Sequence, residues 1–409
     1  EMTSSLVGSE MCIRDSYTIF GGMKSVLYTS VLQTPILLLG SLIILVLGFK
    51  ELGGWDEMMR VCGAVTVNDY GDTMTNLIRS NDDANFPWLG ALIGSAIIGF
   101  WYWCTDQFIV QRVLSGKNEM EARRGTIFGA YLKLLPVFLF LIPGMIAFAL
   151  HQKYIGAGGE GFLPMLENGT ANADAAFPTL VAKLLPAGVK GLVVCGILAA
   201  LMSSLASLFN SSAMLFTIDF YKRFRPQTSE KKLVGIGQVA TVVIVILGIL
   251  WIPIMRSVGD VLYTYLQDVQ SVLAPGIAAA FLLGICWKRT SAQGGMWGLI
   301  SGMVIGLTRL GAKVYYSNAG EVADSTFKYL FYDMNWLFFC GWMFLFCIIV
   351  VIVVSLATEA PTAEKIQGLV FGTATKEQKA STRASWNHWD IIHTVIILAI
   401  TGAFYWYFW

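Results

Sequence analysis

Hydroxyl side chains crowd one long apolar run near the middle of the chain, residues 188–217. In a helix that turns about 100° per residue, Ala200, Ser203 and Ser204 share a narrow sector of one face. A backbone carbonyl and two hydroxyls there offer the uncharged oxygen ligands that a hard monovalent cation accepts. Small residues on one helix face also serve close helix packing. The pattern alone leaves ion binding and packing both open.

A lysine stands deep in another apolar run, residues 126–150. Lys133 comes nine residues after Arg124, which is about 13 Å along a helix. Its ammonium can donate to a polar solute, or it can snorkel to the interface on its long side chain. Pro136 and the Pro143-Gly144 pair predict that this helix bends nearby.

Two more runs carry polar groups beside aromatic or proline residues. Gly94 and Gly99 precede an aromatic cluster that ends in Asp106, a pattern typical of a discontinuous helix that lines a solute path. Interfacial aromatic residues explain the cluster equally simply. Gln267, beside Asp268, offers an amide that donates and accepts, as sugar hydroxyls require. At a helix start, that amide could instead be solvated.

The elements that must position these residues are long apolar segments. The chain has 409 residues, 56% hydrophobic and 13% charged, against roughly 25% charged in soluble domains. A membrane helix needs about 20 apolar residues, and the runs show no period-2 alternation, so we predict an all-α membrane protein. Nine spans are expected, at 28–49, 86–111, 126–150, 188–217, 233–254, 261–286, 293–312, 329–356 and 388–408.

Lysine and arginine gather in alternate loops, after the second, fourth, sixth and eighth predicted spans. The opposite loops, 50–85 and 151–187, are long and acidic or glycine-rich. By the positive-inside rule the basic loops are cytoplasmic, which places the C-terminus outside. The aromatic residues at that terminus fit an interfacial belt.

Several other classes of protein are disfavoured by the residue pattern. The net charge of +1 by itself says nothing about nucleic acid, because the charges lie in short segments between the apolar runs, and no nucleic-acid partner is expected. Three histidines and seven cysteines lack metal-ligand or redox spacing. No nucleophile, base or metal cluster occurs inside the spans, so we do not expect an enzyme. Residues 1–16 are polar and are expected to be a non-native leader, or else an ordinary loop fragment.

Four stretches together resemble the sodium/solute symporter family, and in particular its sodium/glucose cotransporter branch. They run from Trp101 to Arg112, from Tyr131 to Pro136, from Leu201 to Tyr221 and from Phe281 to Arg289. The resemblance begins at about Tyr17 and continues to the C-terminus. It implies a partial LeuT-like bundle of inverted five-helix repeats. Residues 17–286 would hold the last helix of the first repeat and the whole second repeat, and 287–409 the peripheral helices.

The same resemblance implies roles for individual residues. Ala200, Ser203 and Ser204 match sodium ligands, Tyr102 matches an inner gate, and Lys133 and Gln267 match sugar hydrogen-bonders. Gly99 stands where sugar carriers tend to have a hydrogen-bonding side chain. Two departures, at Ser30 and Ala206, argue against a second sodium site.

The expected function is therefore uptake of a sugar or polyol coupled to one Na⁺, by alternating access, in a multi-pass protein of the cell inner membrane. The expected partners are the solute, the sodium ion and the lipid bilayer, and no oligomer is required. Two alternatives stay open. One is sodium-coupled symport of another small solute, such as myo-inositol, an amino acid or a carboxylate. The other is a membrane sensor that kept the fold without transport.

Overall fold

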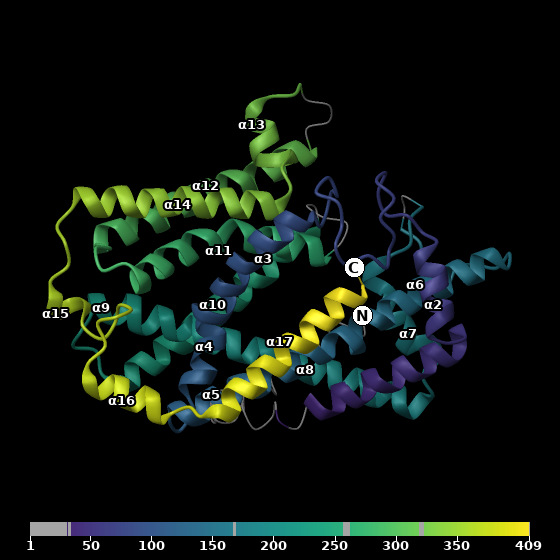
Figure 1. The fold of residues 1–409 in the computed structure, drawn as a ribbon, viewed down its shortest axis with the longest axis horizontal. Coiled ribbons are helices and arrows are strands. Elements are labelled where there is room, and N and C mark those ends of the chain that lie inside the picture. Colours follow the sequence, from purple (N-terminus) through teal and green to yellow (C-terminus); the bar gives the residue numbers. More distant parts are fainter. Residues whose placement is uncertain (1–30, 32–33, 167–168, 257–261, 319–322, 409) are drawn as a thin grey trace. The chain divides into compact units, whose positions relative to one another are not determined.

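The computed structural model describes residues 31, 34–166, 169–256, 262–318 and 323–408. Their helices form two compact units, which we describe separately (Figure 1). One unit contains residues up to Val65, Thr73–Thr75 and Leu132–Pro253, and the other contains the rest. The expected leader at 1–16 and the departure at Ser30 lie outside the described residues, as does the side chain of Ala206.

Seven helices of the described residues are long and apolar enough to cross a membrane. A bent pair of shorter helices, α3 (Trp88–Cys104) and α4 (Gln107–Leu114), makes an eighth if it is counted as one span. The seven are Thr34–Leu52, Glu119–Gly156, Ala187–Phe224, Glu230–Pro253, Leu262–Cys286, Trp336–Ala357 and His388–Tyr407. The remaining predicted span, 293–312, does form a helix, α12 (Ala292–Asn318). Glycine and polar residues lower its hydropathy, so it does not qualify by composition.

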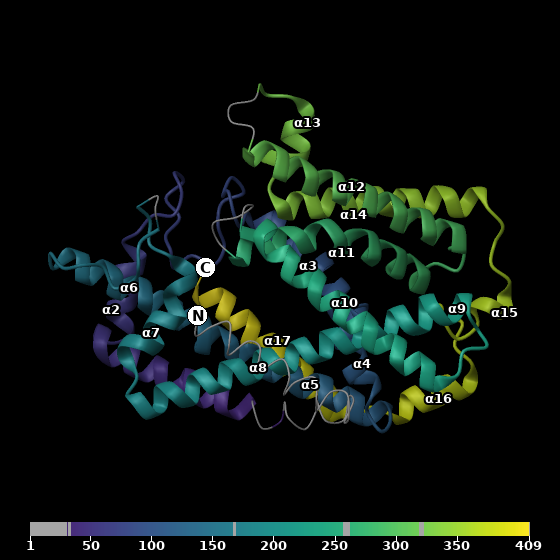
Figure 2. The ribbon, with the colours of Figure 1, turned by 180° about the vertical axis from the view of Figure 1, so that it is seen from behind.

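In the first unit, the helix Thr34–Leu52 precedes α2 (Trp55–Gly63), which packs on α6 (Ile142–Gly156). The same α6 packs against α7 (Ala176–Leu184), as Figures 1 and 2 show. Ile44, Ile146 and Leu180 are fully buried in their shared core. Cys62, which falls in the predicted loop 50–85, is also fully buried there. The first unit also contains the short turn η2 (Ala173–Ala175), α8 (Ala187–Met214), η3 (Leu215–Tyr221), α9 (Lys222–Phe224) and, as far as Pro253, α10 (Glu230–Arg256).

In the second unit, α11 (Leu262–Cys286), α12 and α14 (Trp336–Ala357) lie side by side, and α3 packs against α11 and α14 (Figures 1 and 2). Glycine allows the close approach of α11 and α12. A Cβ added to Gly302 would lie 3.0 Å from the Cα of Gly276 and 3.2 Å from the Sγ of Cys347. A side chain at this position would force the neighbouring atoms to shift, so Gly302 favours the close three-helix contact.

The second unit continues through shorter elements to a last long helix. These are α13 (Thr326–Lys328), the π-helical turn η4 (Tyr329–Asp333), α15 (Ala363–Ile366), α16 (Lys376–Ala384) and α17 (His388–Tyr407). Asn387 and Asp390 form a capping box at the start of α17, which defines where that helix begins. The described residues contain no strand beyond two isolated bridges.

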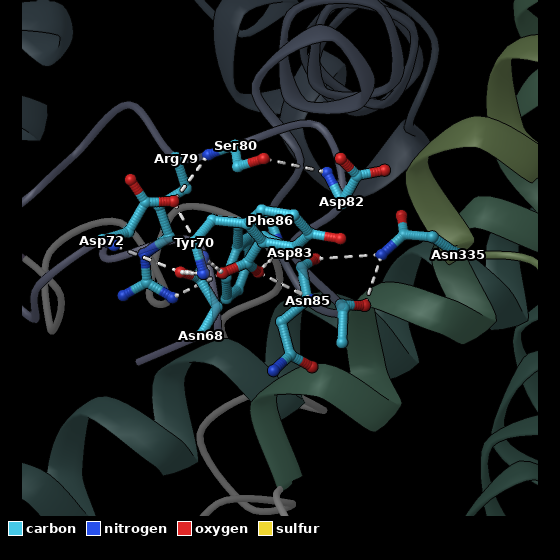
Figure 3. Close-up of polar contacts among 11 residues, drawn as sticks. Asn68, Tyr70, Asp72, Arg79, Ser80, Asp82, Asp83, Asn85, Phe86 and Asn335 are labelled. Atoms are coloured by element: carbon cyan, nitrogen blue, oxygen red, sulfur yellow. Dashed lines mark hydrogen bonds and ion pairs between the residues drawn. The ribbon is translucent and has the colours of Figure 1, made fainter. Parts of the chain in front are cut away.

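An ordered polar loop precedes α3 (Figure 3). Asp83 accepts hydrogen bonds from the backbone N–H groups of Phe86 (2.7 Å) and Asn85 (2.9 Å), and its other oxygen lies 3.5 Å from Arg79. Asn335, the N-cap of α14, donates to the carbonyl of Ala84 at 2.7 Å. The loop thus joins the beginning of α3 to the beginning of α14.

This loop should loosen in acid. Burial alone would raise the pKa of Asp83, but the two backbone N–H groups and the Arg79 guanidinium outweigh burial and lower the pKa below its ordinary value. A carboxyl whose folded pKa is lowered stabilises the fold above its unfolded pKa of about 4, and that stabilisation is lost as pH falls through the folded pKa.

Amide hydrogen exchange at Phe86 measures this effect, once corrected for the intrinsic pH dependence. Between about pH 6 and about pH 3, protection should stay constant down to about pH 5 and then fall as pH is lowered through the folded pKa, which lies below the ordinary carboxyl value of about 4. In Asp83→Asn, protection should be low throughout this range and independent of pH. Equal protection profiles in the parent and in Asp83→Asn would contradict the assignment.

Candidate functional site

The predicted ion ligands lie on α8, which runs without interruption from Ala187 to Met214. Ser203 is buried, with 5% of its surface exposed, Ala200 is half-buried, and Ser204 is exposed. Helical geometry places Ser203 and Ser204 about one turn beyond Ala200, on the same side of the helix, as the sequence predicts. A helical carbonyl keeps a second lone pair after its backbone hydrogen bond, so Ala200 can still accept or ligate. These donors are uncharged oxygens, the set that suits a monovalent cation.

Lys133 lies near the end of α5 (Glu119–Pro136), where its side chain is exposed. Beyond Pro136 the chain continues as the π-helical turn η1 (Val137–Leu141) and then as α6, which has Pro143 in its first turn. Proline removes a backbone donor, and an i→i+5 turn accommodates that loss. A π-helical turn therefore lies where the sequence predicts a bend, within a helix that continues from Glu119 to Gly156.

The second predicted span is discontinuous. Helix α3 ends at Cys104, α4 begins at Gln107, and their axes meet at 49°. The side chain of Asp106 caps α4 by accepting a hydrogen bond from the N–H of Phe108 at 3.0 Å. The prediction of a broken helix from Gly99, the aromatic cluster and Asp106 is confirmed.

Two predicted site residues lie on the last turns of α3. Gly99 is half-buried, and a Cβ added to it would meet no atom within 4 Å. Tyr102 is half-buried, and its ring packs edge-on against that of Trp103 at 5.3 Å. A small residue that adjoins open space, followed one turn later by a phenol ring, is a suitable arrangement for admitting a solute.

Gln267 lies in the second turn of α11 and is half-buried. Its side-chain amide donates to the hydroxyl of Tyr263 at 2.9 Å. The interaction orients the amide and leaves its oxygen as an acceptor. Tyr263 is exposed, so the alternative of a solvated glutamine stays open.

The predicted site residues divide between the two units. Lys133, Ala200, Ser203 and Ser204 belong to the first unit, whereas Gly99, Tyr102 and Gln267 belong to the second. Within the second unit, the helices that carry Gly99 and Gln267 are packing partners.

Sequence reasoning passed over one buried charge, Arg309 on α12, whose side chain has no exposed surface. A signal existed, because Arg309 falls inside a predicted span, where ionisable residues are functional candidates by default. Its partner Asp268 was noted only as a neighbour of Gln267. The contact between Arg309 and Asp268 joins two different helices, so residue spacing along a single helix could not predict it.

The chain is similar in sequence to known sodium-coupled carriers. The model of the sodium:solute symporter family matches residues 5–302. A sodium/mannose cotransporter of Bos taurus is 35% identical over 425 residues, which cover 97% of this chain and 70% of the relative. A human sodium/myo-inositol cotransporter 2 is 36% identical over 374 residues, and a sodium/glucose cotransporter 1 of Ovis aries is 38% identical over 376. The chain spans only 55% of the length of each of these last two relatives.

A solved structure shares the fold. A Na⁺-coupled sialic acid symporter, in a substrate-bound outward-open state, aligns with a TM-score of 0.59 and 20% sequence identity. The alignment covers 85% of this chain and 65% of that structure. At this identity the likeness concerns architecture alone, and it agrees with the predicted all-α, LeuT-like bundle.

Proposed function

The chain belongs to the sodium:solute symporter family, and from that premise we propose that the whole protein carries a sugar or polyol into the cell together with Na⁺. The observation that carries the proposal is the likeness, over 85–97% of this chain, to carriers named for sodium with mannose, myo-inositol or glucose. Transport rather than catalysis is the activity of these relatives, so the proposal includes no enzymatic step.

In this proposal, sodium binds on α8 through the carbonyl of Ala200 and the hydroxyls of Ser203 and Ser204. The burial of Ser203 supports this role, since removal of water strengthens the interaction between an oxygen dipole and a cation. One sodium site is proposed. The uncharged ligand set leaves the charge of the ion uncompensated, so membrane potential acts on the loaded carrier.

The solute would be held by hydrogen bonds from Lys133 and Gln267, with Tyr102 as the inner gate and Gly99 as the space that admits part of the solute. An ammonium that donates and an amide that also accepts match the mixed donor and acceptor character of hydroxyl groups. A longer side chain at position 99 would contact the solute directly. With glycine there, the open space can hold part of the solute or a bridging water.

Coupling follows from differential affinity. Sodium stabilises the outward-facing state that accepts the solute, and its release inside allows Tyr102 to move. Each charge that crosses the membrane contributes about 2.3 kcal/mol per 100 mV. We assign the protein to the cell inner membrane with its C-terminus outside. Residues 17–286 are proposed to form the partial core and 287–409 the peripheral helices.

Counterflow of labelled solutes tests the proposal. Vesicles loaded with unlabelled mannose, glucose, myo-inositol, an amino acid or a carboxylate, in sodium or in choline, are exposed to the same solute in labelled form. We expect exchange of a sugar or polyol in sodium and little in choline. Exchange of amino acids or carboxylates alone would contradict the proposed solute class. Preference for myo-inositol is the second candidate outcome, because a myo-inositol carrier is among the relatives.

A further inference from the structure

A fully buried arginine ties four elements of the second unit together. The guanidinium of Arg309 on α12 donates to the carbonyl of Met334 at 2.8 Å and to that of Leu330, in η4, at 3.4 Å. It also lies 4.1 Å from the ring centroid of Phe339 on α14, a cation–π contact. Finally, it reaches a carboxylate oxygen of Asp268 on α11 at 3.3 Å. A charge buried this completely requires such partners.

Asp268 is shared by two cations of α12. Its second oxygen lies 2.7 Å from the ammonium of Lys313, one turn beyond Arg309. The two cations, spaced i and i+4, therefore hold the two oxygens of one carboxylate. The side chains of Asp268 and Lys313 are 16% and 25% exposed, so solvent screens this pair only weakly. We call Asp268, Arg309 and Lys313 the charge clamp.

The clamp lies on the face of α11 that meets α12. Val272 and Gly276 follow Asp268 at intervals of four residues, and both approach α12, at Gly306 and Gly302. Gln267 is the residue before Asp268, so it points about 100° away around the helix. Its hydrogen bond to Tyr263, four residues earlier, confirms that these two share a different face. The clamp fixes how α11 is rotated about its own axis, and this rotation determines which way the side chain of Gln267 points.

The first turns of α11 need such a tether. Pro275 inside the helix has no N–H, so the carbonyl of Ser271 lacks its usual intrahelical donor. This weakens the connection between the turns that carry Gln267 and the tightly packed remainder of α11. The contacts of Asp268 with Arg309 and Lys313 hold those turns against α12.

We propose that Asp268 is a positioning residue for solute binding: through Arg309 and Lys313 it sets the rotation of α11 so that the amide of Gln267 faces the solute. The inference rests on the proposed function, because it takes Gln267 to be a solute contact. Asp268 itself touches no solute in this account. It acts through the helix that it holds.

The first experiment measures solute affinity in the whole protein. Asp268→Asn keeps the shape of the side chain and removes its charge. It should raise the solute KM by about tenfold, the worth of one hydrogen bond, while the sodium dependence shifts less than the solute KM. Lys313→Met should raise the solute KM less. The variant with both substitutions should have the same solute KM as Asp268→Asn alone, because both changes remove the same interaction. Asp324→Asn removes an exposed carboxyl outside the clamp and serves as the control.

The second experiment reads the orientation of position 267 without any solute. The exposed residues Cys104, Cys195 and Cys286 are first replaced by serine. In that background, Gln267→Cys is labelled with a thiol reagent. The background protein that retains Gln267 serves as the blank. Adding Asp268→Asn should change the labelling rate by about fivefold or more, a typical coupling between sites. Adding Asp324→Asn should leave the rate unchanged.

The two experiments separate the inference from the proposed function. An unchanged labelling rate and an unchanged solute KM in Asp268→Asn overturn the positioning role, and so do single effects on KM that multiply in the double variant. If Asp268→Asn alters the labelling rate while the parent protein shows no sodium-dependent sugar uptake, the control of α11 by Asp268 is supported and the proposed solute class is rejected.

Discussion

Ser203→Ala is expected to raise the sodium concentration for half-maximal uptake by about ten- to a hundredfold, since an interaction between a hydroxyl oxygen and a charged group contributes about 1.5–3 kcal/mol. Ser203 is buried, so water cannot readily replace the lost ligand. Ser204→Ala should act in the same direction but less strongly, because Ser204 is exposed. The maximal rate at saturating sodium should fall less than the apparent sodium affinity.

Ser211→Ala is the matched control for these two variants. Ser211 lies on the same helix, is 3% exposed, and donates its hydroxyl to the carbonyl of Ser207 at 2.6 Å. Its hydroxyl therefore serves the helix itself. Sodium dependence that is equal in Ser203→Ala, Ser204→Ala and Ser211→Ala would identify the serines of α8 as packing residues, which is the alternative that their spacing leaves open.

Gly302→Leu is expected to lower the stability of the second unit by about 1–3 kcal/mol or more, because side-chain atoms would be forced into a filled space. Even a Cβ at this position would lie 3.0 Å from the Cα of Gly276. Separation of α11 from α12 would also disturb the charge clamp, so solute uptake should fall with stability. The midpoint of thermal unfolding in detergent measures the first effect.

Gly295→Leu provides the comparison for Gly302→Leu. Gly295 lies on the same helix, but a Cβ there would meet no atom within 4 Å. The substitution should be neutral or stabilising, since leucine favours a helix over glycine by up to about 1 kcal/mol. Equal unfolding midpoints in the two variants would mean that the close contact at Gly302 does not contribute to stability.

Features that depend on one segment were predictable from the sequence. The break between α3 and α4 follows from glycine, aromatic residues and Asp106 in one short stretch, and the structure places the break at Thr105 and Asp106. The shared face of Ala200, Ser203 and Ser204 follows from helical periodicity. The family follows from ordered motifs, which the family model and the relatives confirm.

Features that join distant segments were not predictable in this way. Cys62 lies in the predicted loop 50–85, yet α2 buries it against Met145 of α6. Arg309 and Asp268 are 41 residues apart and meet because glycines allow α11 and α12 to approach closely. The helix predicted at 293–312 is present as α12, although the glycines that make the close contact lower its hydropathy.

Accumulation of a labelled sugar by proteoliposomes that contain the whole protein tests the central claim most directly. The only energy source would be an inward sodium gradient. The account predicts that the sugar rises inside above its external concentration, and that it merely equilibrates when sodium is equal on both sides. Sugar uptake that never exceeds the external concentration under the gradient, for any of the solutes tested by counterflow, would contradict sodium-coupled symport.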